Sequence, residues 1–237
     1  MNPNYPQTLE DLNAYAVNRK GMFEVVKASL YDYQLYPAAG SPRLSFFANQ
    51  QGKGVTSSIG AVVGQGKTPQ DTNMTLSGQL PVKQGFLAES LEVYFWPGSV
   101  ATALTFIPAG VATFAVAAAD ALANSLEDVS TINQAGAVRI YIGGKEYLYE
   151  APVGRFPPMT RLNIDVATGS NSATVGEVIA GTAYMSGAPY LLDPFLPFVS
   201  NQNFAVTLDY PAAVAMPSGF NGRIGIVLGG WMYRESQ

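Results

Sequence analysis

The sequence predicts an all-β fold, a sandwich or barrel of Greek-key type. About ten segments rich in β-forming residues follow one another along the 237-residue chain, and turns containing glycine or proline separate them. Helical periodicity is limited to two short segments. The sequence has no internal repeat of fixed period, which disfavours propellers and solenoids.

A short helix is predicted near the N-terminus, at residues 8–18 (TLEDLNAYAVN). Thr8 is a suitable N-cap, and two acidic residues fall in the first turn, where negative charge is favourable. The N-terminus lacks the basic and apolar segments of a secretory signal, so synthesis in a cytoplasm is expected. We divide the chain into an N-terminal helical arm, residues 1–20, and a β domain, residues 21–237.

The strands of the N-terminal half begin at about Val25, where the hydrophobic period changes to two, and Pro37 ends the first of them. Three more strands are expected in the segments RLSFFANQ, MTLSGQLP and FLAESLEVYFWPG. Residues 98–136 differ, because they are rich in small side chains and weakly periodic. We interpret them as an insertion within the β domain that contains a helix over about 117–129.

The C-terminal half contains the clearest hairpin, AVRIYIGGKEYLYEAP, with Gly143-Gly144 as its two-residue turn. RLNIDVATG and GEVIAGTAYMSG are weaker strands. The segment PYLLDPFLPFVSNQ contains three prolines, which restrict it to an edge strand or an extended loop. NFAVTLDYP and GRIGIVLGGWMYRESQ complete the set, and Gly225 and Gly229-Gly230 allow a bulge or a close approach of two backbones.

Two residue types that carry much enzyme chemistry, cysteine and histidine, are absent from the sequence. The lack of cysteine excludes disulfides, zinc–thiolate sites and thiol nucleophiles. The lack of histidine excludes Ser-His-Asp triads, histidine acid–base catalysis and cupin-type metal sites. These classes of site are therefore excluded, and we assign no catalytic and no cofactor-binding residue.

The charge content is low: charged residues make up 13% of the chain, against roughly 25% in ordinary soluble domains. We expect neighbouring subunits to cover much of such a surface. No window of about 20 apolar residues indicates a membrane span, and membrane contact through the insertion stays an alternative. The net charge is −4 and no run of Lys or Arg occurs, so strong direct nucleic-acid binding is not expected unless folding gathers distant cations.

The stretch GQGKT, within residues 60–71, is similar to the end of a phosphate-binding P-loop. The required first glycine is replaced by Ala61, and the residues after Thr68 show no helical periodicity, so we reject a nucleotide site. We interpret residues 50–72 as a mobile connection between strands. Lys53 and Lys67 are then expected to make intersubunit contacts, and Lys67→Ala is expected to leave folding unchanged.

Two pairs of neighbouring acidic residues are candidate sites. Glu89 and Glu92 lie three positions apart, which in a regular strand places them on opposite faces. Glu127 and Asp128 are adjacent and are expected to be solvated at a helix end.

Three further acidic residues, Asp165, Asp193 and Asp209, lie in or near predicted strands and could converge after folding. A structural calcium ion in a loop of the β domain is one interpretation, with ligands that the sequence does not identify. A carboxylate pair for glycoside hydrolysis also stays an alternative.

The aromatic residues, 11% of the chain, include Trp96, Trp231, Tyr94 and Tyr233, which could line a carbohydrate-binding face. The interpretation we favour is that they fill the core and the subunit contacts, because aromatic side chains dominate both.

Two longer segments carry a family resemblance, DTNMTLSGQLPVKQGFLAESLEVYFWPG (71–98) and NQNFAVTLDYPAAVAMPSGFNGRIGIVLGGWMYR (201–234). In the succession and spacing of their strands and turns they resemble the jelly-roll major capsid proteins of tailless icosahedral bacteriophages. The resemblance spans most of residues 22–237. It implies a jelly-roll β-sandwich, as a single roll of about eight strands plus extras; the alternative is a compact double jelly roll of roughly sixteen strands.

The resemblance also implies a function, that of a virion structural protein without catalysis, made in the host cytoplasm. Copies would associate as trimers or pentamers and tile a closed shell, in contact with other virion proteins and with a possible underlying lipid membrane. The competing hypotheses are a receptor- or carbohydrate-binding β-sandwich, such as a spike, fibre head or capsid decoration protein, and a glycan-cleaving enzyme.

Overall fold

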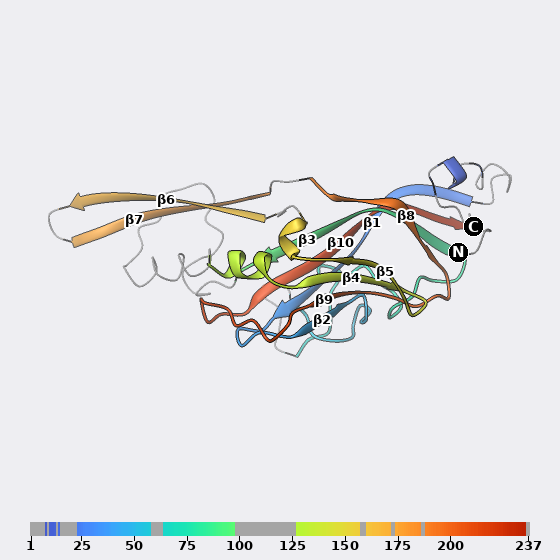
Figure 1. The fold of residues 1–237 in the computed structure, drawn as a ribbon, viewed down its shortest axis with the longest axis horizontal. Helices are drawn as coiled ribbons and strands as arrows, with labels where there is room; N and C mark the ends of the chain where they lie inside the picture. The colour runs from blue at the N-terminus through green and yellow to red at the C-terminus, as the bar shows by residue number, and fades with distance from the viewer. Residues whose placement is uncertain are drawn as a thin grey trace.

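The computed structural model describes residues 8, 10–12, 14, 23–57, 64–97, 127–156, 160–171, 174–185 and 188–235. Within these ranges the chain forms ten strands and little helix, which confirms the predicted all-β fold (Figure 1). Eight strands form two four-stranded antiparallel sheets, and the other two form a separate hairpin.

The sheets are called A and B here, with strand orders β1-β10-β3-β8 and β2-β9-β4-β5. Sheet A consists of β1 (Phe23–Tyr36), β10 (Gly222–Glu235), β3 (Gln84–Trp96) and β8 (Tyr190–Val199). Sheet B consists of β2 (Arg43–Phe46), β9 (Phe204–Asp209), β4 (Ala137–Ile142) and β5 (Lys145–Glu150). The 3-10 turn η1 (Val153–Arg155) precedes the separate hairpin of β6 (Thr160–Asn171) and β7 (Thr174–Met185).

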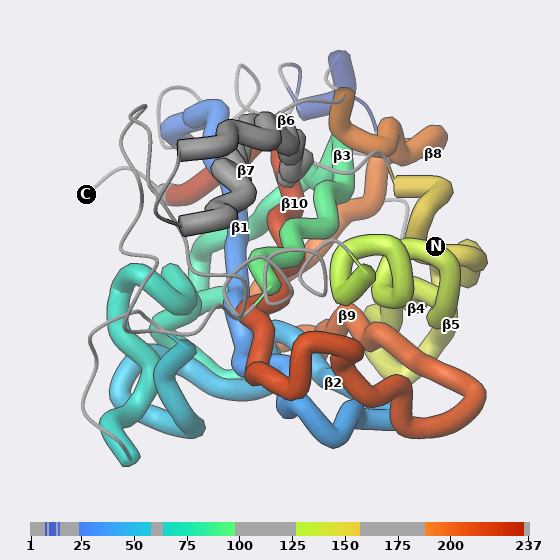
Figure 2. The backbone as a smooth tube through the Cα atoms, turned by 90° about the vertical axis from the view of Figure 1, so that its left-hand side faces the viewer, coloured from blue at the N-terminus to red at the C-terminus, as the bar shows by residue number. Residues whose placement is uncertain are grey.

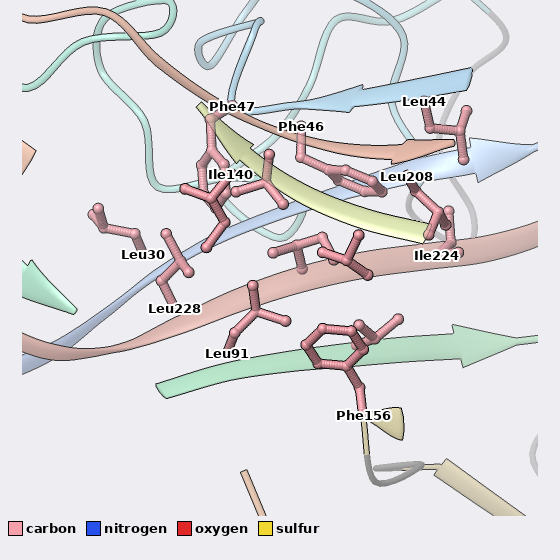
Figure 3. Close-up of a cluster of buried hydrophobic side chains, with 14 of the residues drawn as sticks. Leu30, Leu44, Phe46, Phe47, Leu91, Ile140, Phe156, Leu208, Ile224 and Leu228 are labelled. Carbon is pink, nitrogen blue, oxygen red and sulfur yellow. The ribbon is translucent and has the colours of Figure 1, made fainter. Parts of the chain in front are cut away.

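The hydrophobic core lies between the sheets, and both contribute to one continuous cluster. In Figure 3, Leu30, Leu91 and Leu228 of sheet A point toward Phe46 and Ile140 of sheet B. Side chains alternate between the two faces of a strand, so each strand supplies every second residue to this core. Burial of this apolar surface, at about 25 cal/mol per Å², is the main force that holds the sheets together.

One predicted strand, MTLSGQLP at 74–81, is wrong. Within it Leu76 and Gln79 form only an isolated bridge. Gly78 adopts a left-handed conformation with φ of 65°, its N–H group donates to the carbonyl oxygen of Phe47, and its own carbonyl accepts from Phe204. The segment therefore turns, and Gly78 links the end of β2 to the start of β9.

The other strand predictions hold, including those that rest on turn chemistry. Gly143-Gly144 forms the hairpin turn with φ values of 58° and 80°, the left-handed pair that a type I′ turn requires. The proline-rich strand β8 is an edge of sheet A. The expected irregularity at Gly229-Gly230 is present, because the pairing of β10 with β3 shifts there and leaves Glu89 as the extra residue on β3.

The helical predictions can be compared only where residues are described. Residues 10–12 and 14 are helical, and the Asp11 N–H group donates to Thr8 Oγ1 at 3.0 Å, which confirms Thr8 as the N-cap. The rest of 8–18, and residues 117–126 of the second predicted helix, lie outside the described ranges. That helix continues to residue 134 rather than ending near 129.

The expectation that Asp128 is solvated is wrong. Its side chain is fully buried and accepts hydrogen bonds from the Ser218 N–H group at 2.9 Å and from Ser218 Oγ at 2.5 Å. Asp128 thus ties the helical segment to the loop before β10, while the neighbouring Glu127 is exposed as expected. Across the described residues, no helix combines the length and the apolar character needed to cross a membrane.

Candidate functional site

The outer face of sheet A carries a cluster of aromatic rings around one arginine, here called the aromatic face: Tyr33, Tyr94, Trp96 and Arg223. Tyr94 and Trp96 are stacked, with ring centroids 5.4 Å apart and planes inclined by 14°. Tyr33 lies against both, with centroids at 6.3 Å and 5.8 Å. The guanidinium carbon of Arg223 lies 4.5 Å from the centre of the Tyr33 ring, within cation–π distance.

The aromatic face can form because β10, which lies between β1 and β3, has a glycine at position 225 under the rings. Gly225 pairs with Tyr33 on one side and with Tyr94 on the other. A Cβ atom at position 225 would lie only 2.0 Å from the Tyr33 ring, so the ring lies flat across the backbone of β10. Gly85 does the same for Tyr233, whose ring would be 2.1 Å from a Cβ at position 85. These glycines therefore make room for flat aromatic surfaces. At Gly225 the close neighbour is an aromatic ring, whereas the predicted close approach of a second backbone is found at Gly230, where a Cβ would lie 2.0 Å from the carbonyl oxygen of Leu87.

The phenol groups of this face stay neutral at physiological pH. Burial raises the pKa of Tyr94, and its hydroxyl donates to Glu92 at 2.6 Å, which raises that pKa further. Burial also raises the pKa of Tyr33, although the charge of Arg223 partly offsets the effect. Arg223 therefore supplies positive charge to a surface whose rings are uncharged.

A second apolar patch lies farther along the outer face of sheet A, where Leu12 of the N-terminal arm is fully buried against Leu87 and Tyr233. Trp231 packs against this patch and donates its indole N–H to Glu89 at 3.0 Å. Lys27 completes the group, with its ammonium 2.8 Å from Glu89.

Of the four aromatic residues singled out in the sequence, Tyr94 and Tyr233 are buried, and Trp231 packs against the small hydrophobic cluster that contains Tyr233. The expectation that these residues fill the core is therefore confirmed in part, although all four lie outside the main cluster between the sheets. Their role in subunit contacts stays a prediction. The expectation for the acidic pair also fails, because the bulge at Glu89 turns it to the same outer face on which Glu92 meets Tyr94. Each of the two carboxylates has its own partner.

The loop that contains GQGKT docks on the edge of sheet A, and Figure 2 shows it in cyan and teal, gathered beside β1. Lys67 is almost completely buried, with a side chain 2% exposed, and its ammonium lies 2.5 Å from Oδ1 of Asp32, which is fully buried. The other oxygen of Asp32 accepts the Phe47 N–H group at 2.7 Å. Burial raises the pKa of Asp32, and the charge of Lys67 partly offsets that rise.

The described parts of the predicted mobile connection, 50–57 and 64–72, are thus held in place, and Lys67 is wrong as an intersubunit contact. Its ammonium points into the protein, where no phosphate could reach it. Lys53 is exposed, so its intersubunit role stays a prediction. Gly66, the second glycine of GQGKT, is needed for packing, since a Cβ there would lie 2.6 Å from the backbone of Gly52.

A second buried carboxylate, Asp71, organises the same loop. Its oxygens accept hydrogen bonds from the hydroxyl groups of Thr56, Ser57 and Thr68 and from the N–H groups of Ser57 and Thr68. Burial by itself would raise the pKa of Asp71, but these hydrogen bonds together outweigh burial and hold that pKa below its ordinary value. Arg223 lies 3.6 Å from Asp71 and donates to the carbonyl oxygen of Gln70 at 2.8 Å, which joins the loop to the aromatic face.

The outer face of sheet B carries charges instead of stacked rings, in an ion-pair row made of Arg43, Arg139, Asp209 and Glu146. Asp209 binds Arg43 on one side and Arg139 at 3.2 Å on the other. Arg139 also reaches Glu146 at 3.3 Å and lies 4.3 Å from the centre of the Tyr149 ring.

The three aspartates considered for calcium are not brought together. Asp209 lies in sheet B, where two arginines engage it, Asp193 is exposed on β8 of sheet A, and Asp165 belongs to β6 of the separate hairpin. Among the residues that the structure describes, no group of three or more carboxylates could hold a metal ion.

The comparisons with known proteins add no relative: no family model, no curated protein and no solved structure matches the chain. Function is therefore inferred from the strand pairing and from the chemistry of the surfaces.

Proposed function

We propose that this chain is a virion structural protein, a capsid subunit with a single jelly roll that assembles with copies of itself into an icosahedral shell. The observation that carries the proposal is the nesting of the strand pairs: β1 pairs with β10, β2 with β9, β3 with β8, and β4 with β5. Such nesting arises when one long antiparallel ribbon is rolled up, which is how a jelly roll is built.

The two remaining strands support the same topology. β6 and β7 pair only with each other and are inserted between β5 and β8, so they interrupt the connection without changing the order of either sheet. In the same way, residues 97–136 are inserted between β3 and β4. A jelly roll with long insertions between strands keeps its two sheets and gains surface with which neighbouring subunits can make contact.

The surface chemistry supports an assembling subunit. Charged residues make up only 13% of the chain, and several large apolar side chains among the described residues are exposed. Leu191, on the edge strand β8, is 74% exposed, and Val82 is 64% exposed. Burial of such side chains between subunits gains about 25 cal/mol per Å², and few charges need to lose water.

The test is electron microscopy and light scattering of the purified protein. Closed shells, flat sheets or defined trimers or pentamers are the expected result, and Leu191→Glu is expected to weaken assembly. Ala48→Glu is the matched control, because it adds the same charge at an exposed position whose side chain, a single methyl group, offers little apolar surface. A stable monomer at high protein concentration, for the wild type, would contradict the proposal.

One observation favours a second candidate function, a receptor- or carbohydrate-binding subunit such as a spike or decoration protein. The half-buried rings of Tyr33 and Trp96 lie beside Arg223 on an open sheet face, an arrangement that could stack on a sugar and bind its hydroxyl groups. Binding to a glycan array that Trp96→Ala abolishes, by a protein that stays monomeric, would favour this function over shell assembly.

A further inference from the structure

The buried pair of Asp32 and Lys67 places an amine directly against a carboxyl group, shielded from solvent. The Lys67 Nζ atom lies 2.5 Å from Oδ1 of Asp32, and the two side chains are 2% and 0% exposed. The carboxyl carbon is then no more than one carbon–oxygen bond farther from the nitrogen. An amine and a carboxyl group held this way, without solvent, have the high effective concentration that makes an intramolecular reaction fast.

The surroundings prepare both groups for reaction. The Phe47 N–H group donates to Oδ2 of Asp32 at 2.7 Å and polarises the carboxyl group, as a donor in an oxyanion hole does. Burial raises the pKa of Asp32 and so favours the uncharged carboxyl group, the form that an amine can attack. The Thr72 hydroxyl group lies within hydrogen-bonding reach of Asp32 and donates to the Tyr31 carbonyl oxygen at 3.1 Å, so it helps to hold the carboxyl group in place.

We propose that Lys67 and Asp32 form an intramolecular isopeptide bond. One proton of the ion pair passes from Lys67 Nζ to Oδ1 of Asp32, and the resulting amine attacks the carboxyl carbon, so a carbon–nitrogen bond forms. The carbon–Oδ1 bond breaks, and a second amine proton leaves with this oxygen as one water molecule. The acid and the amine become an amide and water, so the step needs no oxidant, no cofactor and no energy source.

The bond would fasten the loop between β2 and β3 to β1, the edge strand of sheet A. It closes a covalent ring from residue 32 to residue 67, which restricts the unfolded chain and raises the unfolding temperature in the way that a disulfide does. In a chain without cysteine, an isopeptide bond supplies a cross-link that reducing conditions cannot break. This inference stands apart from the shell function, since the cross-link can form in a monomer.

The test is the intact mass of the purified wild-type protein under denaturing conditions. The expected mass is that of the sequence minus one water molecule. Digestion with trypsin is expected to leave Lys67 uncleaved and to release residues 28–43 joined to residues 54–83 as one branched peptide. Lys67→Gln is expected to restore the full sequence mass, and Lys53→Gln, the matched control, is expected to keep the loss of water.

One result would overturn the proposal. A wild-type mass equal to that of the sequence, with cleavage after Lys67, would reduce the pair to a salt bridge, and this measurement does not depend on any variant being able to fold.

Discussion

Two regions of the molecule combine cations with aspartates but differ in their access to water. One is the edge of sheet A on which the loop that contains GQGKT docks, and the other is the outer face of sheet B. At the edge, Asp32 and Asp71 are fully buried, and Lys67 is nearly so. On sheet B, the side chain of Arg43 is 60% exposed, and that of Arg139 is 31% exposed. The same kinds of residue are therefore placed in a low-dielectric and a high-dielectric environment within one molecule.

The difference shows which charges can serve a partner. At the edge, the hydrogen-bonding atoms of the carboxylates are taken up inside the protein, so these charges determine how the loop folds. On sheet B the two arginines and Glu146 reach solvent around Asp209, whose side chain is 14% exposed, so these outer charges can exchange partners at little cost. A shell subunit would therefore be expected to use its ion-pair row for reversible or salt-sensitive contacts and its aromatic face for tighter ones.

The largest effect is expected when the buried pair is broken. Lys67→Ala removes the partner of Asp32, whether the two groups are an ion pair or a joined amide, and leaves a lone carboxylate in the interior. We expect the free energy of unfolding to fall by roughly 3–5 kcal/mol. The loss should shrink as the pH is lowered, because protonation neutralises Asp32 in the variant. Urea unfolding followed by circular dichroism measures both effects.

Lys53→Ala is the matched control, since Lys53 belongs to the same loop but is exposed. It is expected to leave the urea midpoint unchanged. If the two variants were equally stable, Lys67 would behave as the surface residue that the sequence suggested. The charges at the edge of sheet A would then contribute no more to stability than the exposed charges of sheet B.

The next effect concerns Asp71, whose two carboxylate oxygens both accept hydrogen bonds. An asparagine at this position would replace one of these oxygens with an NH2 group, which can only donate. Asp71→Asn is expected to lower the free energy of unfolding by about 2 kcal/mol at neutral pH. The folded-state pKa of Asp71 lies below its ordinary value of about 3.9, so its contribution is complete above about pH 5 and declines as the pH falls. The gap between the wild type and the variant should therefore narrow in acid, and a gap independent of pH would contradict this assignment.

The strands were predictable because periodicity and turn residues are local signals. The hairpin at Gly143-Gly144, the edge strand β8 and the bulge at Gly229-Gly230 each follow from chemistry within a few residues. The strand expected at 74–81 failed because its backbone groups bond to Phe47 and Phe204, which are remote in sequence. Strand pairing is likewise non-local, so the order of the strands within each sheet could not be predicted from the alternation of apolar and polar residues.

The charged sites were harder to predict, because a carboxylate looks alike in sequence whether it is buried or exposed. Asp32 did leave a signal, since it shares with Leu30 the inward-facing register of β1 and so interrupts the apolar alternation. Lys67 and Asp71 lie in a loop without periodicity, and no local pattern marks their burial. The aromatic face depends on Gly225 lying between Tyr33 and Tyr94, which needs the pairing of three strands.

A smaller effect is expected on the aromatic face, which Arg223 joins to the buried edge. Gly225→Ala places a Cβ against the Tyr33 ring, which must swing away from Arg223, and we expect a loss of about 1–2 kcal/mol. Gly229→Ala is the control, because the new Cβ would meet only the movable hydroxyl of Ser90. In a Tyr33→Ala background the effect of Gly225→Ala should disappear, and equal losses in both backgrounds would show that the clash lies elsewhere.

The smallest effect is expected on sheet B, and its salt dependence separates the two regions most directly. Asp209→Asn removes the carboxylate that binds Arg43 and Arg139, and we expect a slight fall in the urea midpoint at low ionic strength. Added salt screens exposed charges, so the shift should vanish in high salt, whereas the deficit of Lys67→Ala should persist there. A shift for Asp209→Asn that resisted salt would mean that the ion-pair row is as shielded from solvent as Asp32, and that it contributes to the fold rather than to a surface for partners.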